Sequence, residues 1–183
     1  RDLHRVDRRQ RQMCIRDSFT GEKIISSSEE AFSLYEKSRF GEKKDGKIEY
    51  SGVEALFLLS QRKLSLQSGK KQLTEEALLK KLKKTDKKIE TKFIVFSDLR
   101  KRGYIVKTAL KYGADFRVYD KGLFPGEEHA KWILFVTKEH ETISWYDFAA
   151  KNRIAHSTKK NLLIAIVDEE GDVSYYEIQW IKP

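Results

Sequence analysis

The sequence has little that would tie it to a membrane, a disulfide framework or a cofactor. It contains one cysteine and two prolines in 183 residues, and its longest apolar run, residues 162–167, is far shorter than the roughly 20 residues of a membrane-spanning helix. One cysteine forms neither an internal disulfide nor a multi-thiolate zinc site, so we expect a reducing compartment, the cytoplasm. The G-x-G-x-x-G, Walker, H-E-x-x-H and G-x-S-x-G motifs are all absent. We therefore expect no cofactor and no membrane partner.

Positive charge is what the chain has in excess. It carries 37 Lys and Arg against 28 Asp and Glu, a formal net charge of +9. Such a balance indicates a polyanionic partner, although composition alone does not identify it. The hydrophobic fraction of 39% is enough for one medium domain or two small ones with a real core.

The first 18 residues differ from the rest of the chain. Residues 1–18 hold six Arg and no Lys, lack a helix- or strand-period apolar pattern, and contain the sole Met and the sole Cys. This string resembles a translated sequencing adaptor, so we expect a non-native segment and exclude it from fold reasoning. The alternative is a genuine basic arm that binds nucleic acid.

The remaining chain divides into two parts, predicted as residues 19–86 and 87–183. The first reads as a small α+β domain. Glu29–Lys37 is a short helix candidate, Ser51 and Glu54 match the S-x-x-E capping box ahead of an apolar run, and Thr74 precedes a third helix. The Lys80–Lys88 stretch is predicted to be a solvated helix end and joint.

The second part reads as an α/β domain. Apolar residues from Ile89 to Leu99 recur at helical spacing and stop at Gly103. Short β-rich segments follow, then a helix candidate over residues 143–156, then two strands joined by an acidic turn. The order α-β-β-β-α-β-β predicts a mixed sheet flanked by helices. We expect Trp132, Trp145 and Trp180 to be core or interface anchors.

Two kinds of RNA-cleaving chemistry are open to these residues. A two-metal nuclease needs clustered carboxylates; the candidates are Asp115, Asp120, Glu127 and Glu128. Metal-free cleavage needs a base for the ribose 2′-OH, an acid for the departing 5′ oxygen and a cation for the phosphorane. Histidine suits the acid, lysine the phosphorane, and tyrosine serves as a base only where nearby positive charge lowers its pKa.

Long motifs favour the metal-free chemistry. The stretch LRKRGYIVKTALKYGADFRVY, residues 99–119, resembles the start of the catalytic domain of archaeal tRNA-splicing endonucleases. Residues 153–183 resemble the end of the same domain, and YSGVEALFLL, residues 50–59, resembles the family's smaller N-terminal domain. The resemblance covers essentially residues 19–183, and it implies a catalytic subunit of the short two-domain type with a restriction-endonuclease-like catalytic domain.

The resemblance also implies a reaction and its residues. The family cuts pre-tRNA at both intron borders without a metal, leaving a 2′,3′-cyclic phosphate and a 5′-hydroxyl. Tyr119 matches the family's general base, His129 its general acid, and Lys160, rather than Lys159, the lysine that stabilises the phosphorane. Arg153 matches an arginine that stacks on a bulged intron base, a common mode of RNA recognition. Each of these residues alone would more often be structural or solvated, and the motif spacing carries the assignment.

Family membership implies an assembly as well. The substrate is intron-containing pre-tRNA with a bulge-helix-bulge, and two cuts need two sites, which implies a homotetramer or a heterotetramer with a second kind of chain. Family subunits insert an acidic loop into a basic cleft of an opposing subunit and pair their last strands; the matching loop residues are Asp168, Glu169, Glu170 and Asp172. Lys80–Lys88 and Arg100–Arg102 are the candidate basic surfaces, and Tyr175–Ile181 is the candidate pairing strand. The alternative function is a non-catalytic RNA-binding or structural subunit of the same endonuclease.

Overall fold

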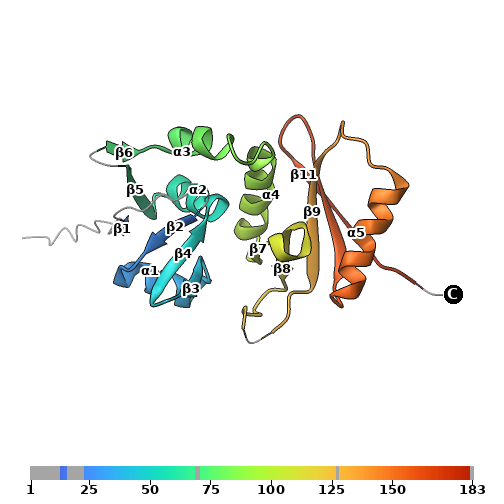
Figure 1. Cartoon of the computed structure of the whole chain (residues 1–183), viewed down its shortest axis with the longest axis horizontal. Helices are drawn as coiled ribbons and strands as arrows, with labels where there is room; N and C mark the ends of the chain where they lie inside the picture. The colour runs from blue at the N-terminus through green and yellow to red at the C-terminus, as the bar shows by residue number, and fades with distance from the viewer. Residues whose placement is uncertain (1–12, 16–22, 69–70, 127, 182–183) are drawn as a thin grey trace, which may run out of the picture.

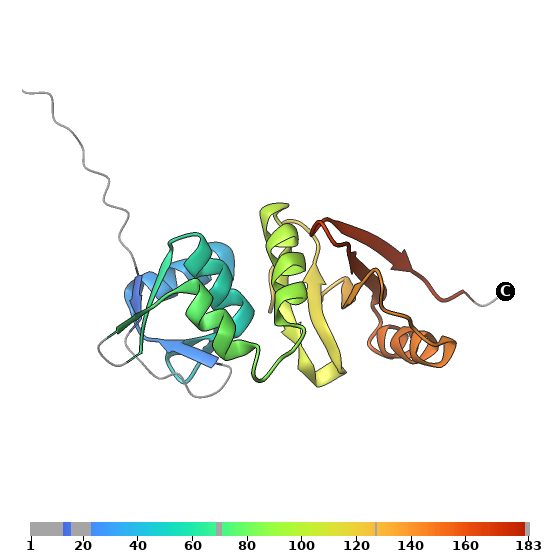
Figure 2. The same ribbon diagram turned by 90° about the horizontal axis from the view of Figure 1, so that it is seen from above.

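The computed structural model describes residues 13–15, 23–68, 71–126 and 128–181. Within this part of the chain, the elements form two lobes that lie side by side, with one long helix at their boundary (Figure 1). Figure 2 shows the same two lobes from above. None of the helices in the described ranges has the length and apolar character needed to span a bilayer.

The N-terminal lobe contains two small sheets and three helices. One sheet has the order β1-β5-β6 and the other the order β2-β4-β3. The elements are β1 (Met13–Ile15), β2 (Lys23–Ser26), α1 (Glu29–Ser38), β3 (Glu42–Lys44), β4 (Lys47–Ser51), α2 (Gly52–Ser60), β5 (Leu64–Ser68), β6 (Lys71–Leu73) and α3 (Glu75–Leu82). Helix α2 is the centre of this lobe, because every residue from Gly52 to Leu58 is buried.

The predicted helix starts in this lobe are confirmed. Ser51 and Glu54 form the complete capping box of α2, with the Ser51 hydroxyl accepting from the Glu54 N–H and the Glu54 carboxylate accepting from the Ser51 N–H. Thr74 caps α3 by accepting from the Ala77 N–H. These side chains satisfy backbone donors that the helix itself leaves unpaired.

The expectation that the first 18 residues take no part in the fold is wrong for three of them. Met13–Ile15, inside the segment excluded above, forms β1 and pairs in parallel with β5, with Met13 opposite Leu64. These three residues are the least polar stretch of that segment, so they can extend along a neighbouring strand. Residues 1–12 and 16–18 lie outside the described part of the chain, and the non-native origin of the segment stays a prediction.

The C-terminal lobe is a five-stranded sheet of order β11-β10-β9-β8-β7. Only β9 and β10 are parallel among its neighbours, which confirms the predicted mixed sheet. The elements are α4 (Ile89–Lys101), β7 (Ile105–Ala109), the 3-10 turn η1 (Leu110–Tyr112), β8 (Ala114–Tyr119), β9 (Trp132–Lys138), α5 (Trp145–Ser157), β10 (Asn161–Val167) and β11 (Val173–Ile178).

Alternate residues of the central strands pack on opposite faces of this sheet. Trp132, Leu134 and Val136 of β9 join the large core that includes α4, whereas Ile133 and Phe135 join a smaller cluster that includes Ala155 of α5. This period of two is what a strand buried on both faces requires. Helices α4 and α5 accordingly flank the sheet on opposite sides (Figure 1).

The structure tests the core half of the tryptophan expectation, and it holds for Trp132 alone. Trp132 is buried, but Trp145 is 85% and Trp180 59% exposed. Trp145 begins α5, which turns Ala155 toward the sheet instead, and its ring packs edge-on to Phe148. The core role is therefore wrong for Trp145 and Trp180, and an interface role for these two stays a prediction.

A buried ion pair between Lys107 and Glu54 joins the two lobes. We call these two residues, together with Gly41, whose backbone binds both of them, the interdomain joint. The Lys107 Nζ lies 3.0 Å from the Glu54 Oε1 and also donates to the Gly41 carbonyl, while the Gly41 N–H donates to the same Glu54 oxygen at 2.9 Å. Both charged side chains are about 95% buried, at 4% and 5% exposure. Burial alone raises the pKa of Glu54, but the Lys107 charge and the N–H bonds from Ser51 and Gly41 outweigh it, so the pKa is lowered.

Arg100 strengthens the same boundary from α4. Its guanidinium donates to the Ser38 carbonyl at 2.6 Å and lies 3.8 Å from the centre of the Phe40 ring, both in the N-terminal lobe. Burial lowers the pKa of Arg100 to about 10. The two lobes are thus held by specific contacts as well as by a shared apolar core.

Candidate active site

Strand topology brings the three predicted catalytic residues to one edge of the sheet. Tyr119 ends β8, His129 comes three residues before β9, and Lys160 immediately precedes β10. Since β8 runs antiparallel to β9 and β10 runs parallel to it, the end of β8 and the starts of β9 and β10 lie at the same edge. Adjacent strands are about 4.8 Å apart. We call Tyr119, His129 and Lys160 the catalytic edge.

Two backbone hydrogen bonds fix this alignment. The Lys131 N–H donates to the Val118 carbonyl at 3.0 Å, and the Asn161 N–H donates to the Lys131 carbonyl at 3.0 Å. Lys160, which precedes Asn161, and Tyr119, which follows Val118, are therefore held on either side of Lys131, two residues after His129. Lys160 is 31 positions from His129 and 41 from Tyr119 in the sequence, and strand pairing alone brings these three segments together.

Tyr119 is the most enclosed of the three. It is only 4% exposed and packs in a small cluster with Ile105, Ala130 and Phe124. Burial raises the pKa of Tyr119, Arg117 opposes the rise, and Tyr112 and Glu42 add to it. This net direction is opposite to the one that a tyrosine base needs, because a base is favoured by positive charge that lowers its pKa.

His129 lies on the loop between β8 and β9 and is exposed. The loop closes on itself: the Leu123 N–H donates to the Asp120 carbonyl at 3.2 Å, and the Glu128 N–H donates to the Phe124 carbonyl at 3.0 Å. Near the loop's ends, the Lys131 Nζ lies 3.0 Å from the Asp120 carboxylate. An exposed imidazole on an anchored loop can reach a leaving group outside the protein.

Lys160 is distinguished from Lys159 by the end of α5. Lys159 adopts a left-handed conformation, with φ of 54°, and its side chain is exposed. The next residue, Lys160, is half-buried; its N–H donates to the Ala155 carbonyl at 2.9 Å and its Nζ to the Thr158 carbonyl at 2.8 Å. The left-handed residue thus lies at the point where the chain leaves α5, and it places Lys160 directly before β10.

Tyr112 is a neighbour of this edge that the sequence did not reveal. Its ring lies 6.0 Å from the Lys160 Nζ, and it contributes to the raised pKa of Tyr119. Tyr112 belongs to η1, which follows β7 and packs against the α5 side of the sheet. In the sequence, Tyr112 lies within the family-like stretch of residues 99–119, which gives no indication of its contacts.

Arg153 lies on α5, about one turn before the helix ends at Ser157, and is exposed. The neighbouring His156 instead packs edge-on against Trp180, with ring centres 4.5 Å apart. This contact gives the His156 side chain a packing role at the end of α5. Arg153 is free of the sheet and available to a bound molecule on the α5 side.

The alternative prediction, a carboxylate cluster for two metal ions, is wrong for Asp115 and Asp120, because these two residues lie far apart. Asp115 and Asp120 lie at opposite ends of β8, which at about 3.3 Å per residue separates them by roughly 17 Å. Asp115 accepts from the Val136 N–H and pairs with Lys92, and Lys131 holds the pKa of Asp120 below its usual range. Glu127 lies outside the described residues, and within them no group of three potential ligands could hold a metal ion.

The acidic turn lies at the other end of the sheet, between β10 and β11. The Asp168 N–H donates to the Asp172 carbonyl at 3.1 Å, and the Asp172 N–H donates to the Asp168 carboxylate at 2.8 Å. Glu169, Glu170 and Asp172 are exposed. The turn is therefore a preformed acidic projection far from the catalytic edge.

The candidate basic surfaces are partly neutralised within the chain. Lys88 pairs with Glu141 at 2.7 Å, and Arg102 with Asp98 at 2.8 Å. Arg100 is turned into the N-terminal lobe. A hollow of about 330 Å³ between the lobes is lined by both charges: its cations are Lys92, Lys107, Lys111 and Arg117, and its carboxylates are Glu42, Glu49, Glu54, Asp86 and Asp115. Lys92, Lys107 and Arg117 pair with Asp115, Glu54 and Glu42 of this lining, whereas Lys111 is exposed.

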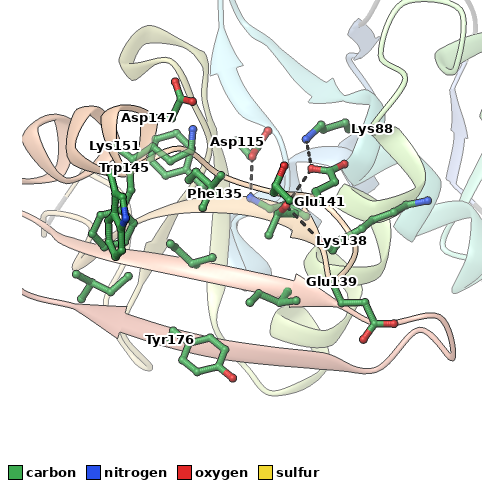
Figure 3. Close-up of a pocket in the computed structure, with 18 of the residues that line it drawn as sticks. Lys88, Asp115, Phe135, Lys138, Glu139, Glu141, Trp145, Asp147, Lys151 and Tyr176 are labelled. Atoms are coloured by element: carbon green, nitrogen blue, oxygen red, sulfur yellow. Dashed lines mark hydrogen bonds and ion pairs between the residues drawn. The ribbon is translucent and has the colours of Figure 1, made fainter.

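A cavity of about 830 Å³ does not coincide with the catalytic edge. Figure 3 shows Trp145 and Lys151 of α5 on one side, Tyr176 of β11 on another, and Lys88 bonded to Glu141 at the rim. Its lining also includes Asp115 near the start of β8, Lys138 at the end of β9 and Ile166 near the end of β10. This cavity lies beside the exposed strand β11 and not beside Tyr119.

Comparison with known proteins identifies the class and then the family. Residues 89–175 match the family described as tRNA intron endonuclease, catalytic C-terminal domain, and residues 15–79 match tRNA intron endonuclease, N-terminal domain. A small domain followed by a catalytic mixed-sheet domain defines the class, a two-domain endonuclease. The chain belongs to the tRNA intron endonuclease family.

Archaeal relatives support this assignment over most of the chain. A tRNA-splicing endonuclease of Thermococcus gammatolerans is 38% identical over 164 residues, covering 89% of this chain and 96% of the relative. The tRNA-splicing endonuclease of Thermococcus onnurineus is 41% identical with coverages of 89% and 94%. That of Methanothermobacter thermautotrophicus is 37% identical over 159 residues, with coverages of 87% and 92%.

Proposed function

We propose that this enzyme cuts pre-tRNA at both exon–intron borders within a bulge-helix-bulge, by attack of a ribose 2′-OH on the adjacent phosphate. The observation that supports the proposal is that Tyr119, His129 and Lys160 stand at, or close to, the same end of three neighbouring strands, β8, β9 and β10. The restriction-endonuclease-like fold is part of the same proposal, supported by the mixed five-stranded sheet between α4 and α5. Action on pre-tRNA would place the enzyme in the cytoplasm.

Each residue of the catalytic edge has one task. Tyr119 takes the proton from the 2′-OH, whose oxygen forms a new bond to phosphorus. The bond from phosphorus to the 5′ oxygen breaks, and His129 gives that oxygen its proton, so the products are a 2′,3′-cyclic phosphate and a 5′-hydroxyl. Lys160 stabilises the extra negative charge of the phosphorane between these events.

The raised pKa of Tyr119 limits how this base works. A buried phenol releases its proton more readily when positive charge lies close, and Arg117 is the cation that opposes the rise in the pKa of Tyr119. We infer that Lys160, from the same sheet edge, adds to this effect once substrate is bound. Substrate binding would bring the 2′-OH between Tyr119 and Lys160. The proposal therefore assigns Lys160 a second effect, lowering the cost of the phenolate.

We further propose that Arg153 stacks on an unpaired base and that the enzyme works as a tetramer, either of this chain alone or with a second kind of chain. Exposed Tyr176, Trp180 and Ile181 follow or belong to β11, the edge strand of the sheet, and support pairing with a second subunit. The acidic turn of Asp168, Glu169, Glu170 and Asp172, which is exposed at three of these residues, supports docking against cations of another subunit, and Lys111 is one exposed cation on the surface of this chain.

Cleavage of a bulge-helix-bulge RNA by the purified chain tests the function. We expect cleavage at both bulges, with Tyr119→Phe, His129→Ala and Lys160→Ala each slower by two orders of magnitude or more. Lys159→Gly is the matched control, because it removes a neighbouring charge at a position whose left-handed backbone suits glycine. Tight RNA binding without any cleavage would instead indicate a structural subunit, and cleavage only with an added chain would indicate a heteromeric enzyme.

Assembly has its own test. Replacing Asp168, Glu169, Glu170 and Asp172 by Asn or Gln should lower the mass measured by light scattering without lowering the melting temperature. An unchanged tetramer would remove the docking role of the acidic turn.

A further inference from the structure

The loop that carries His129 is anchored to the catalytic domain through one aromatic side chain. Phe124 packs against a cluster formed by Ile105, Tyr119 and Ala130. Ala130 is adjacent to His129 in sequence, and Tyr119 is the proposed base. Phe124 therefore packs against the cluster that contains both the proposed base and the residue next to the proposed acid.

The outer face of the same ring meets a side chain of the N-terminal lobe. The Arg39 guanidinium carbon lies 4.9 Å from the centre of the Phe124 ring and 5.5 Å from that of Tyr35, which belongs to α1. The Arg39 side chain is 16% exposed and also pairs with Glu36 at 3.3 Å. A guanidinium in this position links an aromatic ring of each lobe by cation–π attraction.

The backbone of Arg39 makes this placement firm. Arg39 is the C-cap of α1, with a left-handed φ of 55°, and its N–H donates to the Tyr35 carbonyl at 2.8 Å. Its side chain thus leaves the helix from a fixed end, not from a flexible segment. The His129 loop has two glycines at positive φ, Gly122 and Gly126, and is closed by its own backbone hydrogen bonds; the Arg39 contact ties this closed loop to the N-terminal lobe.

We propose that Arg39 is a positioning residue for cleavage: by holding Phe124, the N-terminal lobe fixes the His129 loop against Tyr119. This inference rests on the proposed function and deepens it, because it gives the N-terminal lobe a part in the chemical step beyond assembly. It also explains why an arginine stands where only a helix cap is needed.

Single-turnover cleavage at saturating enzyme, together with RNA affinity, tests the inference. Arg39→Ala and Arg39→Gly should each slow the single-turnover rate about 3- to 30-fold, the range of one cation–π contact, with RNA affinity changed less than twofold. Arg39→Gly also keeps the left-handed backbone free of strain, so it tests the side chain even if Arg39→Ala folds poorly. Arg39→Lys should recover part of the loss.

A double-mutant cycle tests the route through Phe124. Once Phe124→Leu is present, Arg39→Ala should cause little further loss, because the two changes break one contact. Lys43→Ala is the matched control: it removes a cation 5.8 Å from the Phe32 ring within the N-terminal lobe, away from the loop. This control should cleave at the wild-type rate.

Hydrogen exchange gives a readout that does not depend on cleavage. Amides of residues 121–131 should exchange faster in Arg39→Ala than in wild type or Lys43→Ala, while those of α2 stay protected. If the wild type is active and Arg39→Ala shows the wild-type cleavage rate and the wild-type hydrogen exchange, the inference about Arg39 is overturned and the proposed function is not. Weakened RNA affinity with an unchanged single-turnover rate would also overturn it, making Arg39 an RNA contact. An inactive wild type would count against the proposed function, and unchanged loop exchange would then count against the anchoring separately.

Discussion

The interdomain joint and the catalytic edge use similar ionisable side chains in opposite ways. At the joint, Lys107 and Glu54 are almost fully buried, and each satisfies the other together with backbone groups of Gly41. At the catalytic edge, His129 is exposed, and the half-buried Lys160 has no carboxylate partner among the described residues; its Nζ donates to the Thr158 carbonyl at the end of α5. A buried pair of opposite charges holds the two lobes together, whereas a side chain that is exposed, or bound only to a backbone carbonyl, can still interact with RNA. The comparison separates variants that should unfold the protein from those that should only stop cleavage.

The largest expected effect is on cleavage at the catalytic edge. His129→Ala should slow cleavage by about 10²- to 10⁴-fold, because it removes the general acid, while RNA binding and thermal unfolding stay near wild type. His140→Ala, an exposed histidine in the loop between β9 and α5, is the control and should cleave normally. Much weaker RNA binding by His129→Ala would mean that His129 holds substrate or structure instead.

The largest expected effect on folding is at the interdomain joint. Lys107→Met should lower the free energy of unfolding by about 3–5 kcal/mol, because it leaves the buried Glu54 carboxylate without its charged partner. Lys88→Met breaks the exposed pair with Glu141 and should cost about 0–1 kcal/mol. Chemical denaturation measures both. Equal losses would contradict the structural role given to the joint.

The loss of stability at alkaline pH compares Tyr50, near the interdomain joint, with Tyr119, at the catalytic edge. Burial raises the pKa of Tyr50, which lines the hollow between the lobes, and that of Tyr119. The folded protein therefore retains both phenolic protons at a pH where the unfolded chain, with a pKa near ~10, has lost them. Their contribution to stability is complete below that value and is lost as pH rises above it.

Tyr50→Phe and Tyr119→Phe should therefore each flatten the loss of unfolding free energy between about pH 9 and 11, measured by denaturant titration. Only Tyr119→Phe should abolish cleavage. The same steep loss of stability in both variants as in wild type would show that neither phenol is shielded as described.

Local patterns in the sequence predicted much of the fold. The capping box at Ser51 and the cap at Thr74 were predictable because each depends on residues three apart. The order of helices and strands also followed from periodicity, and family resemblance gave the site residues. Glu54 was recognised only as a cap, because its second partner, Lys107, lies 53 positions away.

Features that depend on distant contacts were not predictable in this way. Trp145 was expected to anchor a core or interface, yet α5 leaves it exposed. The contact of Arg39 with Phe124 joins two lobes and has no sequence signature. The burial that raises the pKa of Tyr119 likewise depends on Ile105, Phe124 and Ala130 coming together.

The central claim is that Tyr119, His129 and Lys160 cleave RNA without a metal. The most direct test incubates the purified chain with a bulge-helix-bulge RNA in EDTA and identifies the chemical ends of the products. The account predicts cleavage at both bulges that leaves 2′,3′-cyclic phosphate and 5′-hydroxyl ends. Cleavage that requires added magnesium and leaves 3′-hydroxyl and 5′-phosphate ends would contradict it.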